Sequence, residues 1–316
     1  MTPAPILLFT YKRLHVLKQT IDALKNNCLA AESELFIFSD AAKCAEDEPV
    51  VSRIRAYLGQ VTGFKNIEIT EAKTNKGLAN SIIDAVSEVI DKRGSVIVLE
   101  DDLITAPNFL LFMNSCLEEY RCADKVFSIS GYAFNLGNAT KYAEDAYFLN
   151  RGWSWGWATW KDRWEKVDWQ VSNYSEFLAD KSAQRAFARG GSDLNKMLAK
   201  QMVGKLDSWA IRWFYHQFHI QGLTVYPVLS KVYNAGFDKH ATHTTGSNAR
   251  YLPVMDASGK TTFKLPASVQ LNTYYNRKFR KKMGVLSRLV SKVDTYLKRL
   301  FENDSPDKKT EEYIPG

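Results

Sequence analysis

Short apolar runs alternate with amphipathic segments along the first hundred residues of the chain. Apolar runs and alternating patterns predict strands at 5–10, 34–40, 66–70 and 95–99. Apolar residues recur at helical spacing between them, which predicts helices at 14–27, 50–58 and 78–90. This alternation predicts an α/β fold with a mostly parallel central sheet that carries helices on both of its faces.

The pattern is less regular beyond residue 100. It predicts helices at 109–120 and 210–221, a strand at 126–130, and a tryptophan-rich run at 153–160 whose structure the pattern leaves open. We assign residues 1–265 to one domain with a first half, 1–125, and a second half, 126–265. The composition changes after that, so residues 266–316 are predicted to form a helical tail.

The tail combines positive charge with one apolar helical face. The basic run Arg277 to Lys282 comes first, and the apolar residues that follow on one face are Leu286, Leu289, Val290, Val293, Leu297 and Leu300. Such a helix is typical of proteins that bind an anionic membrane surface, so 277–301 is a candidate membrane contact. Packing on the rest of the chain and contact with another subunit are the alternatives.

Charge and cysteine content narrow the class of protein. The formal net charge is +7, which favours an anionic partner. The charge is concentrated in the tail and no nucleic-acid-binding motif is present, so we expect no nucleic acid. The four cysteines form no CxxC pair, and the sequence shows neither a secretory leader nor an apolar run of the about 20 residues that span a bilayer. We therefore predict a cytoplasmic protein, peripheral on the cytoplasmic face of the inner membrane.

Polar residues follow each of the four predicted strands in the first hundred residues. They are Thr10-Tyr11-Lys12-Arg13, Asp40, Asn75-Lys76-Gly77 and Glu100-Asp101-Asp102. The carboxyl ends of parallel strands meet at one edge of a sheet, where α/β proteins bind their ligands. We therefore expect the four clusters to line one crevice.

The acidic triplet is the strongest candidate for chemistry. Three carboxylates after a buried strand need a cationic partner. Their hard oxygens suit Mg²⁺ or Mn²⁺, which bridges to phosphate oxygens and stabilises a departing diphosphate. Strand alternation predicts Glu100 and Asp102 on one side and Asp101 on the other. A solvated acidic turn is the alternative.

A family resemblance rests on this region. Residues Val98 to Leu103, followed by Ala106-Pro107-Asn108-Phe109, resemble the metal-binding region of GT-A glycosyltransferases. The chain is similar to the N-acetylglucosaminyltransferase I family and its bacterial sugar-transferase relatives from about Pro5 to His243. The resemblance implies a GT-A (Rossmann-like) nucleotide-diphospho-sugar transferase fold. The nucleotide sugar would bind to the first half, and the acceptor to the second.

The resemblance also assigns roles around the acidic triplet. It implies that Asp102 ligates the metal and that Asp101 contacts the ribose, with Glu100 beside them in the donor site. Arg13 closes the segment that begins at Thr10, and the resemblance places it near the phosphates, which a guanidinium binds with two hydrogen bonds. A surface charge at the start of a helix is the alternative for Arg13.

Two further strand ends receive roles in donor binding. Asp40 occupies the place of a family residue that reads the uracil edge, and a turn or helix-cap residue is its alternative. Asn75, Lys76 and Gly77 match a segment that lies along the nucleotide, with Gly77 allowing close approach of the backbone.

The second half contains a candidate general base. An inverting transferase needs a base that deprotonates the acceptor hydroxyl. The family has an aspartate directly before a tryptophan, whereas Asp207 stands one residue earlier, with Ser208 next to Trp209. Asp207 is our candidate base, and an N-cap role for the following helix is its alternative.

Two more segments are expected to border the substrates. The run Gly152 to Trp157 matches a Gly-rich stretch between donor and acceptor, so we expect Trp155 and Gly156 to contact sugar; a packed aromatic core is the alternative. The family's loop over the donor corresponds to 225–243. His243 is assigned to the metal there, with His240 as the second candidate and an exposed loop histidine as the alternative.

Together with the resemblance, these features predict a metal-dependent glycosyltransferase of polysaccharide biosynthesis that uses Mn²⁺ or Mg²⁺, and the resemblance implies that it is inverting. It would move a hexosyl or N-acetylhexosaminyl group from a UDP-sugar to a glycan or lipid-linked glycan. One alternative is a nucleotidyltransferase acting on sugar phosphates, although its usual Gly-rich phosphate loop is missing. The other is a basic, non-enzymatic nucleic-acid-binding protein.

Overall fold

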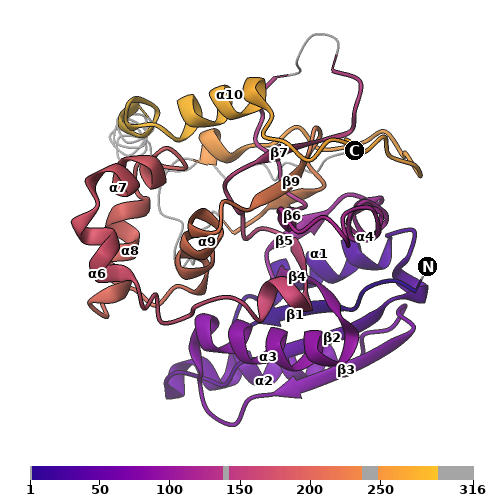
Figure 1. The fold of residues 1–316 in the computed structure, drawn as a ribbon. Helices are drawn as coiled ribbons and strands as arrows, with labels where there is room; N and C mark the ends of the chain where they lie inside the picture. Colours follow the sequence, from indigo (N-terminus) through magenta and orange to yellow (C-terminus); the bar gives the residue numbers. More distant parts are fainter. Residues whose placement is uncertain (1, 138–141, 237–247, 291–316) are drawn as a thin grey trace, which may run out of the picture.

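The computed structural model describes residues 2–137, 142–236 and 248–290 (Figure 1). Its strands are β1 Ile6–Thr10, β2 Glu34–Ser39, β3 Asn66–Glu71, β4 Ser95–Glu100, β5 Leu103–Thr105, β6 Val126–Ser130, β7 Ala146–Leu149, β8 Trp157–Trp160, β9 Leu223–Pro227 and β10 Val232–Asn234. Its α-helices are α1 Leu14–Lys25, α2 Glu48–Leu58, α3 Gly77–Arg93, α4 Phe109–Glu119, α5 Lys161–Trp164, α6 Tyr174–Ala179, α7 Lys181–Ala188, α8 Leu194–Met202, α9 Trp209–His219 and α10 Thr273–Met283.

One eight-stranded sheet runs through both halves, in the order β3-β2-β1-β4-β8-β6-β9-β7 (Figure 1). The first four strands are parallel to one another, as are β6 and β9. Strand β8 is antiparallel to both of its neighbours, and β7 is antiparallel to β9. Six of the eight strands therefore point the same way, which confirms the predicted mostly parallel sheet.

Helices cover both faces of this sheet because its strands are apolar on both sides. In β1, Ile6 and Leu8 join the hydrophobic layer that contains α1, α2, α4 and α10. Leu7 and Phe9 point the opposite way, into the layer formed by α3 and by α5 to α9. The α/β fold class is thus confirmed, and the carboxyl ends of β1 to β4 lie at one edge.

The tryptophans of the second half form part of the core. Trp157, Trp164, Trp209 and Trp213 are at most 3% exposed, and the rings of Trp157 and Trp213 lie 4.5 Å apart. The packed aromatic core is therefore the correct interpretation for Trp157, the member of the predicted run among these four. Because Trp209 and Trp213 anchor α9, they also fix the position of the residues just before that helix.

Residues 225–227 correct one expectation. They belong to the segment expected to form a loop over the donor, yet they lie in β9, inside the sheet between β6 and β7. Thr224, Val225 and Tyr226 are fully buried, because both faces of this strand pack against the core. His240 and His243 lie outside the described residues.

The first part of the predicted tail packs on the domain. Tyr275, Phe279 and Met283 of α10 are at most 2% exposed. The ring of Tyr275 stacks on that of Tyr147, with 3.9 Å between the centroids. The predicted alternatives for the tail were membrane contact, packing on the rest of the chain and contact with another subunit. The buried face of α10 packs on the rest of the chain. Among the described residues, no helix combines the length and the apolar character needed to cross a membrane.

A buried ion pair supports the segment that leads to the site. Lys231, directly before β10, pairs with Asp256, and both side chains are at most 4% exposed. Asp256 also accepts hydrogen bonds from Asn108 at 3.0 Å and from the Ser258 backbone at 2.8 Å. Burial opposes its charge, but these partners hold the pKa of Asp256 well below its usual range. Burial lowers the pKa of Lys231.

Replacing Asp256 by alanine is expected to lower the free energy of unfolding by about 3 kcal/mol, because it leaves the Lys231 ammonium buried and unpaired. Denaturant unfolding at pH 7 measures the change. The control Asp91→Ala removes the exposed partner of Lys161 and should cost less than about 1 kcal/mol. Since the folded-state pKa is depressed, the contribution is fully present above about pH 4 and declines as the pH falls. Equal losses in the two variants would contradict this assignment.

Candidate functional site

The acidic triplet forms a turn at the end of β4. The strand ends at Glu100, residues 101–102 are a turn, and β5 begins at Leu103. Side chains alternate between the two faces of β4 only as far as Glu100. The prediction that Glu100 and Asp102 lie on one side and Asp101 on the other assumed a longer strand, so its basis is wrong. The turn is fixed from α1, because the Thr20 hydroxyl donates to the Asp101 carbonyl at 2.9 Å.

Asp101 is buried, and its carboxylate binds residues at the end of β1 and just after it. It is 4% exposed, and its carboxylate accepts from the Thr10 hydroxyl at 3.1 Å, the Tyr11 backbone at 3.2 Å and Arg13 at 2.7 Å. A carboxylate has about four acceptor positions, and three are used here. Asp101 and Thr10 thus hold the strand ends together, and this geometry lends no support to the predicted ribose contact.

Arg13 bridges the two aspartates. The same Nη2 atom that binds Asp101 lies 2.8 Å from Oδ2 of Asp102. Although burial disfavours its charge, the two neighbouring carboxylates raise the pKa of Arg13. The sequence prediction placed Arg13 near phosphates, and the structure brings it to the acidic residues themselves, as their counter-ion.

Glu100 is the carboxylate of the triplet that Arg13 does not bind. It is half-buried, and its side chain makes no hydrogen bond or ion pair with another described residue. Burial, followed by the negative charges of Asp102 and Asp101, raises the pKa of Glu100 to about 8. The triplet and Arg13 together carry three potential negative charges and one positive charge, so a cationic ligand at Glu100 and Asp102 is electrostatically favoured.

The segment after β10 closes over Asp102. The Ala235 backbone donates to the Asp102 carbonyl at 2.8 Å, and Asn234 accepts from the Gly236 backbone at 2.7 Å. A Cβ atom on Gly236 would lie 1.9 Å from Oδ2 of Asp102 and 2.8 Å from Nη1 of Arg13. Only glycine fits there. Sequence reasoning did not assign Gly236, although the Asn234-Ala235-Gly236 turn was a visible signal.

A second cluster surrounds the start of α3. Asp40 accepts from the backbones of Ala41 and Lys76 at 2.9 Å and of Gly77 at 3.0 Å. The Asn75 side chain donates to the Ala41 carbonyl at 2.7 Å. Asp40 therefore satisfies two of the free N–H groups at the α3 N-terminus. Asp40 thus acts as a helix-cap residue, which was the alternative to the predicted uracil contact. Its geometry lends no support to that contact.

Asp207 belongs to this second cluster. A Cβ atom on Gly77, whose φ is +74°, would lie 3.8 Å from Oδ2 of Asp207. Ser208, not Asp207, caps α9, since its hydroxyl accepts from the Ile211 backbone. Asp207 is 60% exposed, and its nearest cation is Arg212 at 3.8 Å. The proposed base is thus free of a capping role and lies beside the predicted donor segment.

The two clusters meet at the end of β1. The Asp40 backbone donates to the Thr10 carbonyl at 3.1 Å, and Thr10 binds Asp101 as described above. Tyr11, next in the chain, donates to Asp47 at 2.5 Å and accepts from the Lys43 backbone at 2.9 Å. Burial and the bond to Asp47 raise the pKa of Tyr11 to about 12. The strand-end residues predicted from sequence therefore lie along one edge of the sheet. The Tyr11–Asp47 hydrogen bond at this edge was not predicted from the sequence.

Two predicted sugar contacts lie deeper than expected. Gly156 is buried, and a Cβ atom there would lie 2.8 Å from Val232 and 3.3 Å from Leu99. It permits close packing behind the strand that ends at Glu100, which corrects its assignment as a sugar contact. Trp155 is half-buried, with its ring centroid 4.7 Å from that of Tyr132 and 5.5 Å from that of Tyr251.

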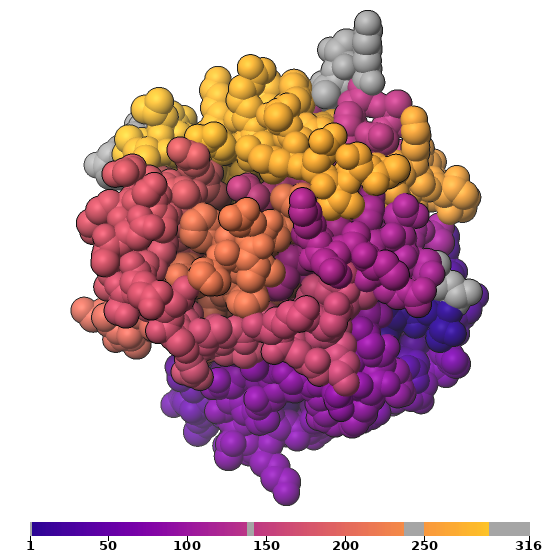
Figure 2. Space-filling view, viewed as in Figure 1, coloured from indigo at the N-terminus to yellow at the C-terminus, as the bar shows by residue number. Residues whose placement is uncertain are grey.

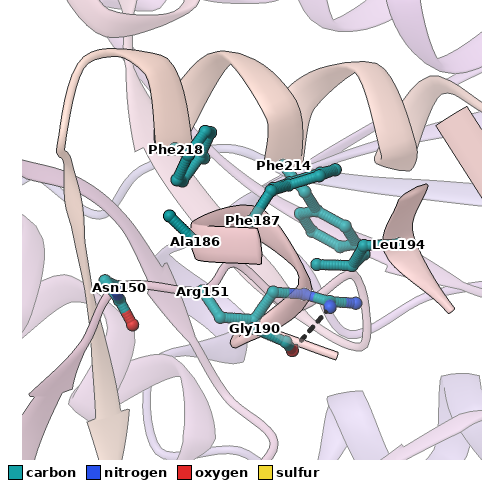
Figure 3. Close-up of a pocket in the computed structure, with 8 residues that line it drawn as sticks. All are labelled: Asn150, Arg151, Ala186, Phe187, Gly190, Leu194, Phe214 and Phe218. Atoms are coloured by element: carbon teal, nitrogen blue, oxygen red, sulfur yellow. Dashed lines mark hydrogen bonds between the residues drawn. The ribbon is translucent and has the colours of Figure 1, made fainter. Parts of the chain in front are cut away.

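Two hollows differ in what they can hold. One, of about 780 Å³, lies between α2 and the segment after β3, beside Ala41 and Ala42, and has the size of a small-molecule site. The other surrounds the buried Arg151, whose guanidinium donates to Gly190 at 2.9 Å and lies near Phe214 (Figure 3). Its volume of about 10 Å³ has room for at most a single water molecule.

The acidic edge fits a divalent cation by its donor chemistry. Among the residues that the structure describes, no three His, Cys, Asp or Glu side chains gather as a complete ligand set. Magnesium is usually held by one or two carboxylates together with water and substrate phosphates, so a complete protein cage is not required. Glu100 and Asp102 would supply those carboxylates.

No known family model matches the chain, and no curated protein does. Solved structures do align with it. A mannosyltransferase from Pyrobaculum calidifontis, in complex with GDP-Man and Mn²⁺, is 12% identical over 53% of this chain and 47% of its own, with a TM-score of 0.37. TarS from S. aureus is 9% identical over 53% of this chain and 30% of its own, with a TM-score of 0.37. Mouse xyloside xylosyltransferase 1 is 12% identical over 69% of this chain and 82% of its own, with a TM-score of 0.36. The chain spans less than half of the first two proteins.

Replacing Gly236 by alanine is expected to lower the free energy of unfolding by about 2 kcal/mol, because the new Cβ displaces Asp102 or the segment above it. Denaturant unfolding measures this loss. Gly59→Ala is the matched control, since Gly59 has a helical φ of −62° and its nearest atom lies at 3.8 Å. Wild-type stability of Gly236→Ala would show that the close approach to Asp102 does not restrict this position to glycine.

Proposed function

We propose that this chain is a metal-dependent glycosyltransferase of GT-A type that uses a nucleoside-diphosphate sugar, with UDP as the nucleotide. The observation that carries the proposal is the acidic edge of the sheet. Among the described residues, Asp101 and Asp102 share one counter-ion, Arg13, and the side chain of Glu100 beside them has none. A Mn²⁺ or Mg²⁺ ion would offset this net negative charge, and the bound ion would in turn attract the donor diphosphate.

The donor would lie along the carboxyl ends of β1 to β4. Glu100 and Asp102 would hold the cation, which stabilises negative charge on the departing diphosphate when bound. Arg13 would stay with the two aspartates, while Lys12 and Lys76 would exchange their present partners, Asp47 and Asp84, for the phosphates. The hollow beside Ala41 and Ala42 has room for the nucleoside, next to the turn that Asp40 organises.

The reaction would be an inverting displacement. The acceptor oxygen forms a bond to C1 of the sugar as the bond from C1 to the diphosphate oxygen breaks. Asp207 takes the hydroxyl proton, and the diphosphate leaves with the electron pair. Support for this role comes from the position of Asp207 beside Gly77 and from its freedom from capping.

The finer assignments follow from the same proposal. The transferred group is a hexose or N-acetylhexosamine, and the acceptor is a glycan or lipid-linked glycan of polysaccharide biosynthesis. We place the enzyme in the cytoplasm, on the inner face of the inner membrane. Residues 1–265 would form the catalytic domain, with donor-binding and acceptor halves that meet at β4 and β8.

Asp207→Asn is expected to lower kcat about a hundredfold with little change in the KM for the donor, because it removes a base and leaves donor contacts intact. Steady-state release of UDP from UDP-sugars, in the presence of an acceptor, measures both constants. Asp91→Asn, at an exposed ion pair on the end of α3, is the matched control. An unchanged kcat would remove Asp207 from the mechanism.

The products separate the glycosyltransferase from its main rival. A glycosyltransferase releases a nucleoside diphosphate from a nucleotide sugar. A nucleotidyltransferase would instead consume a nucleoside triphosphate and a sugar phosphate and release pyrophosphate. Pyrophosphate formation with no diphosphate release would contradict the proposal.

A further inference from the structure

Four aliphatic side chains are exposed together just after α10. Residues 285–290 are helical, and Val285, Leu286, Leu289 and Val290 are 62%, 80%, 53% and 69% exposed. They account for four of the nine exposed large hydrophobic residues in the described part of the chain. A cluster of this kind in a soluble domain marks a surface that contacts something else.

Unpaired cations lie directly beside this cluster. Arg277, Lys278, Arg280 and Lys281 are exposed on α10, and none of them forms an ion pair with a described residue. Residues 265–293 contain no Asp or Glu, so no acidic neighbour along the chain offsets this charge. The segment therefore presents a surplus of positive charge next to apolar side chains.

The surface is fixed to the domain. Tyr275, Phe279 and Met283 are buried on the opposite side of α10, which leaves the four cations outward. The Ser192 backbone donates to the Met283 carbonyl at 3.2 Å, and Arg288 pairs with Asp193 at 2.5 Å. These contacts attach 285–290 to the corner between α7 and α8. Figures 1 and 2 show α10 along the upper edge of the molecule, beside α7.

We propose that residues 277–290 form a docking surface for an anionic lipid bilayer. Aliphatic side chains enter the boundary between headgroups and acyl chains, while neighbouring Lys and Arg bind the anionic headgroups. A nucleic acid would account for the cations and leave the aliphatic cluster unexplained. Another subunit would cover the aliphatic residues but bring like charges together. Helix α10 packs on β7, which lies at the opposite end of the sheet order from β3, β2, β1 and β4, so docking and catalysis can be tested independently.

Vesicle flotation with the full chain tests this surface, using phosphatidylcholine vesicles with and without 30% phosphatidylglycerol. The wild type is expected to bind the anionic vesicles and not the neutral ones. Arg280→Gln with Lys281→Gln should weaken binding about 25-fold, about fivefold for each cation removed. Leu286→Ser with Leu289→Ser should weaken it at least about tenfold, since two exposed leucines lose their apolar insertion.

The controls match each change in chemistry. Arg121→Gln with Lys125→Gln removes two exposed cations elsewhere, and Leu178→Ser with Val203→Ser removes two exposed aliphatics of 47% and 64% exposure. Both controls should bind as the wild type does, and all variants should keep its melting temperature. The proposal is overturned if either the Arg280/Lys281 variant or the Leu286/Leu289 variant binds vesicles as the wild type does. It is also overturned if the wild type fails to bind vesicles and instead binds single-stranded DNA or self-associates through Leu286.

Discussion

Arg13→Met is expected to lower the free energy of unfolding of the metal-free protein by about 4 kcal/mol. The substitution keeps most of the side-chain volume but leaves two buried carboxylates without their shared counter-ion. Addition of Mn²⁺ should then raise the melting temperature of the variant more than that of the wild type, because the cation replaces the lost charge. Thermal and denaturant unfolding, each with Mn²⁺ and with EDTA, measure the two effects.

The control for this substitution is Arg93→Met. Arg93 also binds a carboxylate, Glu34 at 2.8 Å, but its side chain is 42% exposed. An exposed pair contributes less than about 1 kcal/mol, and Mn²⁺ should have no selective effect on this variant. If Arg13→Met unfolds like the wild type in EDTA, Arg13 is not the counter-ion of the acidic edge.

Asp102→Asn is expected to reduce metal-dependent turnover of the donor about a thousandfold. The amide keeps the shape of the side chain but removes a charge that binds the cation, and metal stabilisation of a leaving group is worth several kcal/mol. The variant should stay folded, because Arg13 still pairs with Asp101. Rates measured across a Mn²⁺ titration would show a loss that high metal concentrations only partly restore.

The matched control is Asp124→Asn, at an exposed turn before β6. It should leave both turnover and metal dependence unchanged. Full turnover in Asp102→Asn with an unaltered Mn²⁺ requirement would place the metal elsewhere in the protein.

The first half of the chain was predictable because local pattern and tertiary structure agree there. Each strand from β1 to β4 is a short apolar or alternating run, and each helix has a regular apolar face. Parallel pairing then requires the strand ends to meet, so the gathering of Thr10, Asp40, Gly77 and Asp101 was foreseeable. The segment 161–202 was left unassigned, because its four helices have only four to nine residues each.

The roles of individual residues were harder to predict than their location. A carboxylate at a strand end suits both a ligand and the backbone N–H groups of the next element. Asp40 accepts three backbone hydrogen bonds, and Asp101 accepts one each from a backbone N–H, a hydroxyl and a guanidinium, partners that the sequence did not reveal. Gly156 is similar, since a glycine beside tryptophans suits both a sugar site and the close packing observed against Leu99.

The most direct test is a thermal-shift screen of nucleoside-diphosphate sugars with Mn²⁺ and with EDTA, on the wild type and Asp102→Asn. A ligand that binds only the folded state raises the melting temperature by mass action. We predict a rise for the wild type with at least one UDP-sugar in Mn²⁺, none in EDTA, and none for Asp102→Asn. No response of the wild type to any nucleotide sugar, with Mn²⁺ or Mg²⁺ present, would contradict a donor site at Glu100-Asp101-Asp102.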